Sequence, residues 1–224
     1  MAYRDVIDSV KREGRRILTE YESKEVLKEF GIPVLNEYFI KEVSELDLIA
    51  PNIRFPVVAK GVSRTIAHKT EKNLVRLYIK NPSELKSEFL DIMKNEEVEG
   101  VLISPQILDK REFLLGLRYD DQFGYVVVFG LGGIFTEALR DITMRVCPIT
   151  KDEAMDMIRE VRYSKLLGSI RGFKAVNIER IADTIVNLSR LSEVITEISE
   201  IDINPLMFDE TDPVVVDALI VLKG

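Results

Sequence analysis

The spacing of apolar and polar positions predicts helices alternating with strands along this chain. Apolar residues at helical spacing indicate helix over the first thirty residues. Within the segment SKEVLKEFGIP, Ser23 is a candidate N-cap, and Gly31 followed by Pro33 predicts the end of the helix.

Capping signals and apolar periodicity predict three more helices. Asn81-Pro82 supplies an N-cap and a proline at the first helical position, so a helix should follow. Thr150 to Glu153 forms a capping box before another helix. Isoleucine and leucine at three- and four-residue steps over residues 178–198 predict a helix with one buried face.

Short apolar runs rich in β-branched residues predict the strands. They cover residues 34–40, 55–59, 74–79, 98–104, 112–118 and 125–129, and two more, near 200–208 and 214–221, flank a turn at 209–213. This order mixes hairpins with single helices and lacks a steady βαβ rhythm, so it favours an α+β fold.

Composition excludes several classes of protein. The 224 residues carry a net charge of −7, which argues against nonspecific nucleic-acid binding. No apolar run reaches the roughly 20 residues of a membrane span. Cys147 is the only cysteine, which excludes a disulfide scaffold and fits a reducing compartment. We therefore expect a globular cytoplasmic protein that binds neither membrane nor nucleic acid.

The C-terminal strands carry the clearest candidate chemistry. Ile201 to Asn204 alternates apolar and oxygen-bearing side chains, so Asp202 and Asn204 should share one face. The following strand brings Asp217 alongside. Carboxylate and carboxamide oxygens are hard ligands that suit Mg²⁺, whereas the alternative interpretation is a solvent-facing polar edge.

Three other features could contact phosphate. Gly130 to Gly133 follows an apolar strand and can present backbone N–H groups to an anion, although a tight turn explains it equally well. Lys60 ends another strand and can reach phosphate oxygens or simply be solvated. His68, the only histidine, can act as an acid–base group, a ligand or a phosphoryl acceptor, or lie on the surface.

In their order along the chain, these pieces resemble a known family. The segments that carry the resemblance are LTEYESKEVLKEFGIPV, FPVVAKGVS with His68-Lys69, EGVLISPQ, the long block from REFLLG to RVCPIT, and EIDINPLMF with VVVDA. Together they are similar to the ATP-grasp β subunit of ADP-forming acyl-CoA (acetyl-CoA) synthetases, relatives of the succinyl-CoA synthetase β subunit. The resemblance implies an ATP-grasp fold of two lobes with a nucleotide between them.

The resemblance also implies domain limits and site residues. It suggests a helical extension over 1–22, a first lobe over 23–103 and a second lobe over 104–224. Asn204 and Asp217 match the Mg²⁺ ligands of the family. Positions matching catalytic or phosphate-site residues are His68, Asp202, Glu137 and Arg145. Positions matching nucleotide-binding residues are Lys60, Val101, Ser104, Gln106, Ile107, Glu112, Gly132 and Gly133.

The reaction implied by the resemblance is acyl-CoA + ADP + phosphate = carboxylic acid + CoA + ATP. His68 matches the histidine that passes a phosphoryl group to ADP, and a CoA-binding α subunit would hold the first phosphohistidine in an α2β2 assembly. Two alternatives are a stand-alone ATP-grasp carboxylate ligase and a non-catalytic nucleotide-sensing subunit.

One segment departs from the family pattern. The family reads His-Lys-Ser-Asp-x-Gly-Gly-Val, whereas this chain continues from His68 to Val75 with Asn73-Leu74 in place of the two glycines. We expect this replacement to remove easy access to positive φ and to stiffen the segment.

Overall fold

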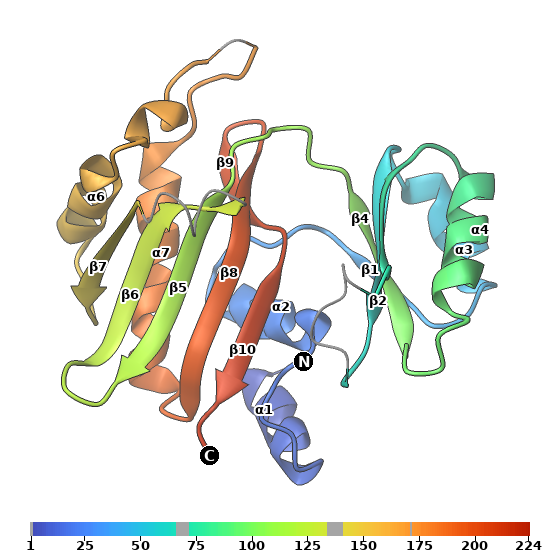
Figure 1. Cartoon of the computed structure of the whole chain (residues 1–224), viewed down its shortest axis with the longest axis horizontal. Helices are drawn as coiled ribbons and strands as arrows, with labels where there is room; N and C mark the ends of the chain where they lie inside the picture. The colour runs from blue at the N-terminus through green and yellow to red at the C-terminus, as the bar shows by residue number, and fades with distance from the viewer. Residues whose placement is uncertain (1, 66–71, 134–140, 171) are drawn as a thin grey trace. The chain divides into compact units, whose positions relative to one another are not determined.

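The computed structural model divides the chain into two compact units (Figure 1). The larger unit joins Met1–Val34 to Ile107–Gly224, and the smaller unit is Leu35–Gln106. This division differs from the predicted ranges chiefly because residues 23–34 lie with the C-terminal part of the chain. The structure describes residues 2–65, 72–133, 141–170 and 172–224.

The smaller unit is built on a four-stranded antiparallel sheet in the order β1-β4-β2-β3. Figure 1 shows α3 and α4 on the same side of this sheet. Its elements in chain order are β1 (Tyr38–Ile40), α3 (Glu45–Ile49), the 3-10 turn η1 (Ala50–Asn52), β2 (Val57–Val62), β3 (Val75–Ile79), α4 (Pro82–Ile92) and β4 (Gly100–Pro105).

Helix α4 begins where its sequence predicts. The Asn81 side chain accepts a hydrogen bond from the Glu84 N–H at 2.9 Å, which satisfies one of the free donors of the first turn. Leu85 and Phe89 pack from α4 into the core of the smaller unit. Helix α3 lies in a polar stretch for which no element was predicted, and it buries only Leu46.

The larger unit contains a second antiparallel sheet in the order β10-β8-β5-β6-β7, with β9 also paired to β8. Its strands are β5 (Phe113–Asp120), β6 (Gly124–Leu131), β7 (Ile142–Val146), β8 (Ile198–Asp209), β9 (Asp212–Val215) and β10 (Ala218–Leu222). Its helical elements are α1 (Tyr3–Arg12), α2 (Glu20–Glu29), α6 (Lys151–Glu160), the 3-10 turn η3 (Ser164–Leu167) and α7 (Ile178–Val194).

The two faces of this second sheet differ in chemistry. Leu115 and Leu117 of β5 and Ile201 of β8 are buried in one core with Ile185 of α7, which runs behind the central strands in Figure 1. The intervening residues therefore point to the other face, because strand side chains alternate. We call this other face the site face; it carries Leu114, Gly116, Arg118, Val128, Glu200, Asp202 and Asn204.

The N-terminal thirty residues form two helices rather than the continuous helix that was predicted. Gly14, with φ of +70°, follows α1, and α2 begins after Thr19. Thr19, not Ser23, is the N-cap of α2, and it forms a capping box with Glu22. Ser23 is buried, and its Oγ accepts a hydrogen bond from the Ile220 N–H of β10 at 3.1 Å. This contact is one reason that α2 belongs to the larger unit.

The last predicted strand is interrupted. Residues 214–221 were expected to be continuous, but β9 ends at Val215 and β10 begins at Ala218. Val216 and Asp217 lie between them. The predicted turn before β9 is confirmed, since Asp209 pairs with Asp212 across two loop residues.

Cys147 is a free thiol whose pKa burial raises to about 12. Such a thiol stays protonated at neutral pH. In the part of the chain that the structure describes, no helix is long and apolar enough to cross a membrane.

Candidate functional site

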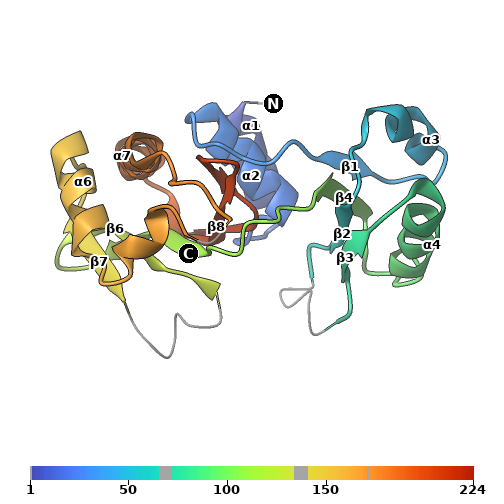
Figure 2. The same cartoon turned by 90° about the horizontal axis from the view of Figure 1, so that it is seen from above.

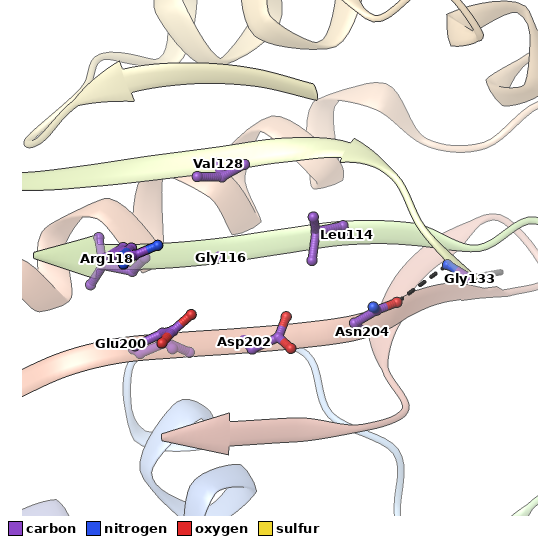
Figure 3. Close-up of a pocket in the computed structure, with 10 residues that line it drawn as sticks. Leu114, Gly116, Arg118, Val128, Gly133, Glu200, Asp202 and Asn204 are labelled. Atoms are coloured by element: carbon purple, nitrogen blue, oxygen red, sulfur yellow. Dashed lines mark hydrogen bonds between the residues drawn. The ribbon is translucent and has the colours of Figure 1, made fainter. Parts of the chain in front are cut away.

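The polar residues of β8 project from one side of the larger sheet. Ile201 and Ile203 point into the core, so Asp202 and Asn204 lie together on the site face. Figure 3 shows Glu200, Asp202 and Asn204 following one another along β8. The alternation read from the sequence is therefore confirmed at this strand.

Strand pairing on either side brings the break that contains Asp217 alongside the Asn204–Pro205 segment of β8. Ile203 pairs with Ala218, and three residues further along β8, Leu206 pairs with Val215. Between these two pairs, the Val216 N–H donates to the Pro205 carbonyl oxygen at 3.2 Å. Asp217 follows Val216, and its negative charge helps to raise the pKa of Asp202, so it lies near the site face.

The glycine loop closes onto the same residues. The backbone N–H of Gly133 donates to Oδ1 of Asn204 at 3.3 Å (Figure 3). Gly133 has φ of +69°, and a Cβ there would overlap the Glu112 carboxylate. The Gly132 N–H donates to the Glu112 carbonyl oxygen at 2.9 Å. The positive φ favours glycine at residue 133, and the Glu112 carboxylate, which lies against the loop, would have to move to admit a Cβ.

A cavity of about 620 Å³ lies over this part of the site face. Its volume falls within the roughly 300–1,000 Å³ that small-molecule sites occupy. Gly116 pairs with Asp202, and because it has no side chain it leaves space between Asp202 and Val128 (Figure 3). Arg118, the next residue of β5 on this face, supplies a positive charge at the same cavity.

The charges at the site disfavour an ionised Asp202. Burial raises the pKa of Asp202, and the negative charges of Glu200 and Asp217 raise it further. Clustered carboxylates are stabilised by a cation. Within residues 2–65, 72–133, 141–170 and 172–224, no group of three His, Cys, Asp or Glu side chains could hold a metal ion. Mg²⁺ suits the arrangement here because it needs only one or two protein carboxylates and keeps waters and phosphate oxygens as its other ligands.

The predicted nucleotide-binding residues of the smaller unit lie on two faces of its sheet. Lys60 is only 7% exposed and pairs with Leu102, while Ser104 pairs with Val58. By strand alternation, Lys60 and Ser104 share the face opposite the α4 side. Val101 points to the α4 side, in the core, and it pairs with Ile40 of β1 and Gly61 of β2.

The smaller unit ends at Gln106. The side-chain oxygen of Gln106 accepts a hydrogen bond from the Tyr78 backbone N–H at 3.1 Å, and the backbone N–H of Gln106 donates to the Pro56 carbonyl oxygen at 3.0 Å. These bonds tie the end of β4 to neighbouring segments of the smaller unit. Ile107 is buried and is the first residue after the boundary.

Arg145 does not join the predicted site. It pairs with Val127, a core residue, so both point to the helix-covered face of the sheet. Its guanidinium donates to Glu160 of α6 at 2.5 Å, and this hydrogen bond raises the pKa of Arg145. Because Asp202 and Asn204 lie on the other face, Arg145 is corrected from a phosphate-site candidate to a partner of α6.

Two further candidates, His68 and Glu137, lie outside the described residues. Part of the segment after His68 that departs from the family pattern lies within the described residues. In it, Asn73 has a φ of 54°. Asparagine tolerates the left-handed region better than most residues. The expected loss of positive φ is therefore wrong at Asn73.

Sequence reasoning missed Arg118, Glu200 and Lys24. Arg118 and Glu200 line the cavity and pair with each other across β5 and β8. Extending the alternation of Asp202 and Asn204 by two residues would have found Glu200. The sequence around Lys24 does not predict its burial, because a lysine in a polar helix is usually solvated. In the structure, Lys24 is 1% exposed.

The two-unit fold, the glycine loop and the oxygen-rich β8 define a nucleotide-binding ATP-grasp protein. The sequence matches the ATP-grasp domain family over residues 9–222, and the chain belongs to this family. It is 40% identical over 229 residues to the β subunit of an ADP-forming acetate–CoA ligase (II) of Pyrococcus furiosus, covering 98% of this chain and 97% of that protein. The chain thus belongs, within the ATP-grasp proteins, to the family of these β subunits.

Solved structures agree with this assignment. Acetyl-coenzyme A synthetase 1 of Ca. Korarchaeum cryptofilum, in complex with coenzyme A and Ca-AMPCP, is 36% identical with a TM-score of 0.92, covering 99% of this chain and all of that one. A second structure of that protein contains coenzyme A and Mg-AMPPCP, with its phosphohistidine segment pointing towards the nucleotide-binding site. It is 35% identical, with a TM-score of 0.88, and covers 99% of this chain and 100% of that chain.

Proposed function

We propose that this chain is the nucleotide-binding β subunit of an ADP-forming acyl-CoA synthetase, with acetyl-CoA as the expected substrate. The reaction is acyl-CoA + ADP + phosphate = carboxylic acid + CoA + ATP. The observation that carries the proposal is that Asp202 and Asn204 share the site face, while Asp217 lies close enough for its charge to raise the pKa of Asp202. The Pyrococcus furiosus relative, which matches nearly the whole chain, bears this activity in its name.

Asn204 and Asp217 would hold Mg²⁺. The Asn204 oxygen accepts one N–H and has a second lone pair for a metal ion. The negative charges of Glu200 and Asp217 near Asp202 favour a cation at this place. When bound, Mg²⁺ neutralises phosphate charge and orients the phosphoryl group that is transferred. The Mg-AMPPCP in the Korarchaeum structure supports the choice of this ion.

Each unit contains residues that we assign to nucleotide binding. In the larger unit, Gly132 and Gly133 would place the loop beside the phosphates, while their own N–H groups hold the loop to Glu112 and Asn204. In the smaller unit, Lys60 would neutralise phosphate oxygens, and Ser104 shares its face. The backbone from Val101 to Ile107, which includes Gln106, would contact the adenine edge.

Transfer would proceed through phosphohistidine. The N–P bond of a phosphohistidine breaks, and the same phosphorus forms a bond to a terminal β-phosphate oxygen of ADP. Such transfer depends on positioning and charge neutralisation rather than on further covalent chemistry by the protein. We propose that His68 carries the phosphoryl group on this chain, that Asp202 faces the incoming phosphohistidine, and that Glu137 lies near the phosphates.

A CoA-binding α subunit would supply the rest of the reaction. It would hold CoA and the first phosphohistidine, and an α2β2 assembly is the arrangement we propose. The word "beta" in the name of the Pyrococcus furiosus relative supports a two-subunit enzyme. A cytoplasmic location stays a prediction from the sequence.

Reconstitution tests the proposal. The full chain should release or absorb heat on titration with Mg-ADP, and it should make ATP from acetyl-CoA, ADP and phosphate only after a matching α subunit is added. Radiolabelled phosphate should then appear on this chain and be absent from the His68→Ala variant. Complete turnover by the chain alone, or ATP hydrolysis driven by a carboxylic acid without CoA, would overturn the two-subunit assignment.

A further inference from the structure

A buried lysine contacts the backbone next to Asp217. Lys24 lies on α2, and its Nζ donates to the Val216 carbonyl oxygen at 2.7 Å. The same Nζ donates to Glu20 Oε1 at 2.6 Å, and the side chains of both residues are 1% exposed. A buried ammonium group is costly unless it is paired and hydrogen-bonded. Lys24 meets that requirement with one carboxylate and with a carbonyl of the strand break.

The contact holds the break between β9 and β10. The Val216 N–H donates to the Pro205 carbonyl oxygen at 3.2 Å, and its carbonyl accepts from Lys24. Both backbone groups of Val216 are therefore held, on one side by β8 and on the other by α2. The Val216 carbonyl belongs to the same planar peptide as the Asp217 nitrogen. Lys24 thus restricts the peptide plane from which the Asp217 side chain projects.

Helix α2 contacts the chain on both sides of Asp217. Ser23 binds the Ile220 N–H, three residues after Asp217, and Lys24 binds the carbonyl just before it. The Ser23 contact lies within β10, which pairing with β8 already holds in place, since Ile220 pairs with Ile201. The Lys24 contact falls where the strand is interrupted. Of the two contacts, the Lys24 one is therefore better placed to orient Asp217.

We propose that Lys24, charge-neutralised by Glu20, is a positioning residue for the magnesium site. It holds the Val216–Asp217 peptide so that the Asp217 carboxylate stays near Asp202 at the site face. This inference rests on the proposed function, namely on Asn204 and Asp217 as the metal ligands. Groups that orient a metal ligand are typically worth 10- to 100-fold in metal affinity.

Replacement of Lys24 tests the inference. In Lys24→Met, the dissociation constant for Mn²⁺ in the presence of ADP should rise about tenfold or more. The dissociation constant for ADP without metal should stay within twofold. Because the single variant leaves the Glu20 carboxylate buried without Lys24, the double variant Glu20→Gln/Lys24→Met should be measured beside it. The double variant removes both charges together and should show the same loss of Mn²⁺ affinity.

The matched control is Ser23→Ala, which removes the neighbouring contact of α2 to Ile220. It should lower the midpoint of thermal unfolding and leave Mn²⁺ affinity unchanged. Mn²⁺ binding to the full chain is measured by electron paramagnetic resonance, and folding by circular dichroism. If the folded double variant binds Mn²⁺ as tightly as the wild type, Lys24 has only a structural role and the inference is overturned.

Asp217→Asn separates this inference from the proposed function. Loss of Mn²⁺ affinity in Asp217→Asn but not in the double variant would reject the positioning role of Lys24 and keep the metal site. Unchanged Mn²⁺ affinity in Asp217→Asn would reject the metal site itself, and the Lys24 inference with it. Loss in both, with Ser23→Ala unchanged, is the expected result.

Discussion

The backbone N–H of Gly133 lies 3.3 Å from Oδ1 of Asn204, so the glycine loop after β6 is hydrogen-bonded to the oxygen-bearing edge of β8. These residues are 71 positions apart in the chain. The bond leaves the Asn204 oxygen one lone pair for another ligand. It connects the glycine loop, which was expected to bind phosphate, with Asn204, which was expected to bind the metal ion.

Gly133→Ala should disturb both features at once. An alanine there would hold an unfavourable positive φ, at a cost of about 1–2 kcal/mol, and its Cβ would overlap the Glu112 carboxylate. We expect lower stability and weaker Mg-ADP binding, measured by urea unfolding and calorimetry.

Gly124→Ala is the matched control for the backbone cost. Gly124 has φ of +73°, and a Cβ there meets nothing within 4 Å. It should lose a similar 1–2 kcal/mol of stability and keep Mg-ADP affinity. Equal losses of Mg-ADP affinity in the two variants would contradict a specific role for the glycine loop.

Asp217→Ala should weaken Mg-ADP binding by roughly tenfold or more, with much less effect on ADP without metal. The reason is that Asp217 is proposed to contact the ion rather than the nucleotide. Calorimetry with and without Mg²⁺ measures the two affinities. Asp209→Ala, at the exposed hairpin end of β8, serves as the control and should change neither. A parallel decline of both affinities in Asp217→Ala would assign that residue to folding.

Asp202 should make stability depend on pH. Burial, followed by the charges of Glu200 and Asp217, raises the pKa of Asp202 above its ordinary value of 3.8. The folded state therefore binds the Asp202 proton more tightly than the unfolded state does. The resulting contribution to the free energy of unfolding is complete below pH 3.8 and is lost as the pH rises through the raised pKa. Asp202→Asn should be more stable than the wild type at pH 7, and this difference should vanish at low pH.

Urea unfolding of the wild type and of Asp202→Asn, from below pH 3.8 up to about pH 7, measures the difference in their free energies of unfolding. The same variant should lose phosphoryl transfer in the reconstituted enzyme, because the proposed function places Asp202 at the phosphohistidine. A stability difference that stays constant with pH would show that ionisation of Asp202 is not its cause.

Arg145→Gln should leave Mg-ADP affinity within about twofold of the wild type, because Arg145 lies on the helix-covered face. The variant loses one ion pair with Glu160, which is partly exposed and worth about 1 kcal/mol or less. Calorimetry and thermal unfolding check the two expectations. A large loss of Mg-ADP affinity at unchanged stability would restore Arg145 to the phosphate site.

Local patterns determined much of the fold. The capping box at Thr150 and the N-cap at Asn81 are confirmed, because a cap involves residues only three positions apart. The alternation through Asp202 is confirmed because strand side chains have a period of two. Ser23 was wrong as a cap because Thr19 offers a complete capping box four residues earlier.

By itself, the sequence determined the family, the strand that carries Asp202 and Asn204, and the chemistry of their oxygens, all of which follow from neighbouring residues. Only the tertiary structure decided that the strand is interrupted at Asp217, that Arg145 points away from Asp202 and Asn204, and that Lys24 is buried beneath Val216. Strand register, sheet face and helix docking bring distant segments together, as between Lys24 and Val216, which are 192 residues apart. Burial across such separations depends on how whole elements pack, and no local spacing of residues encodes it.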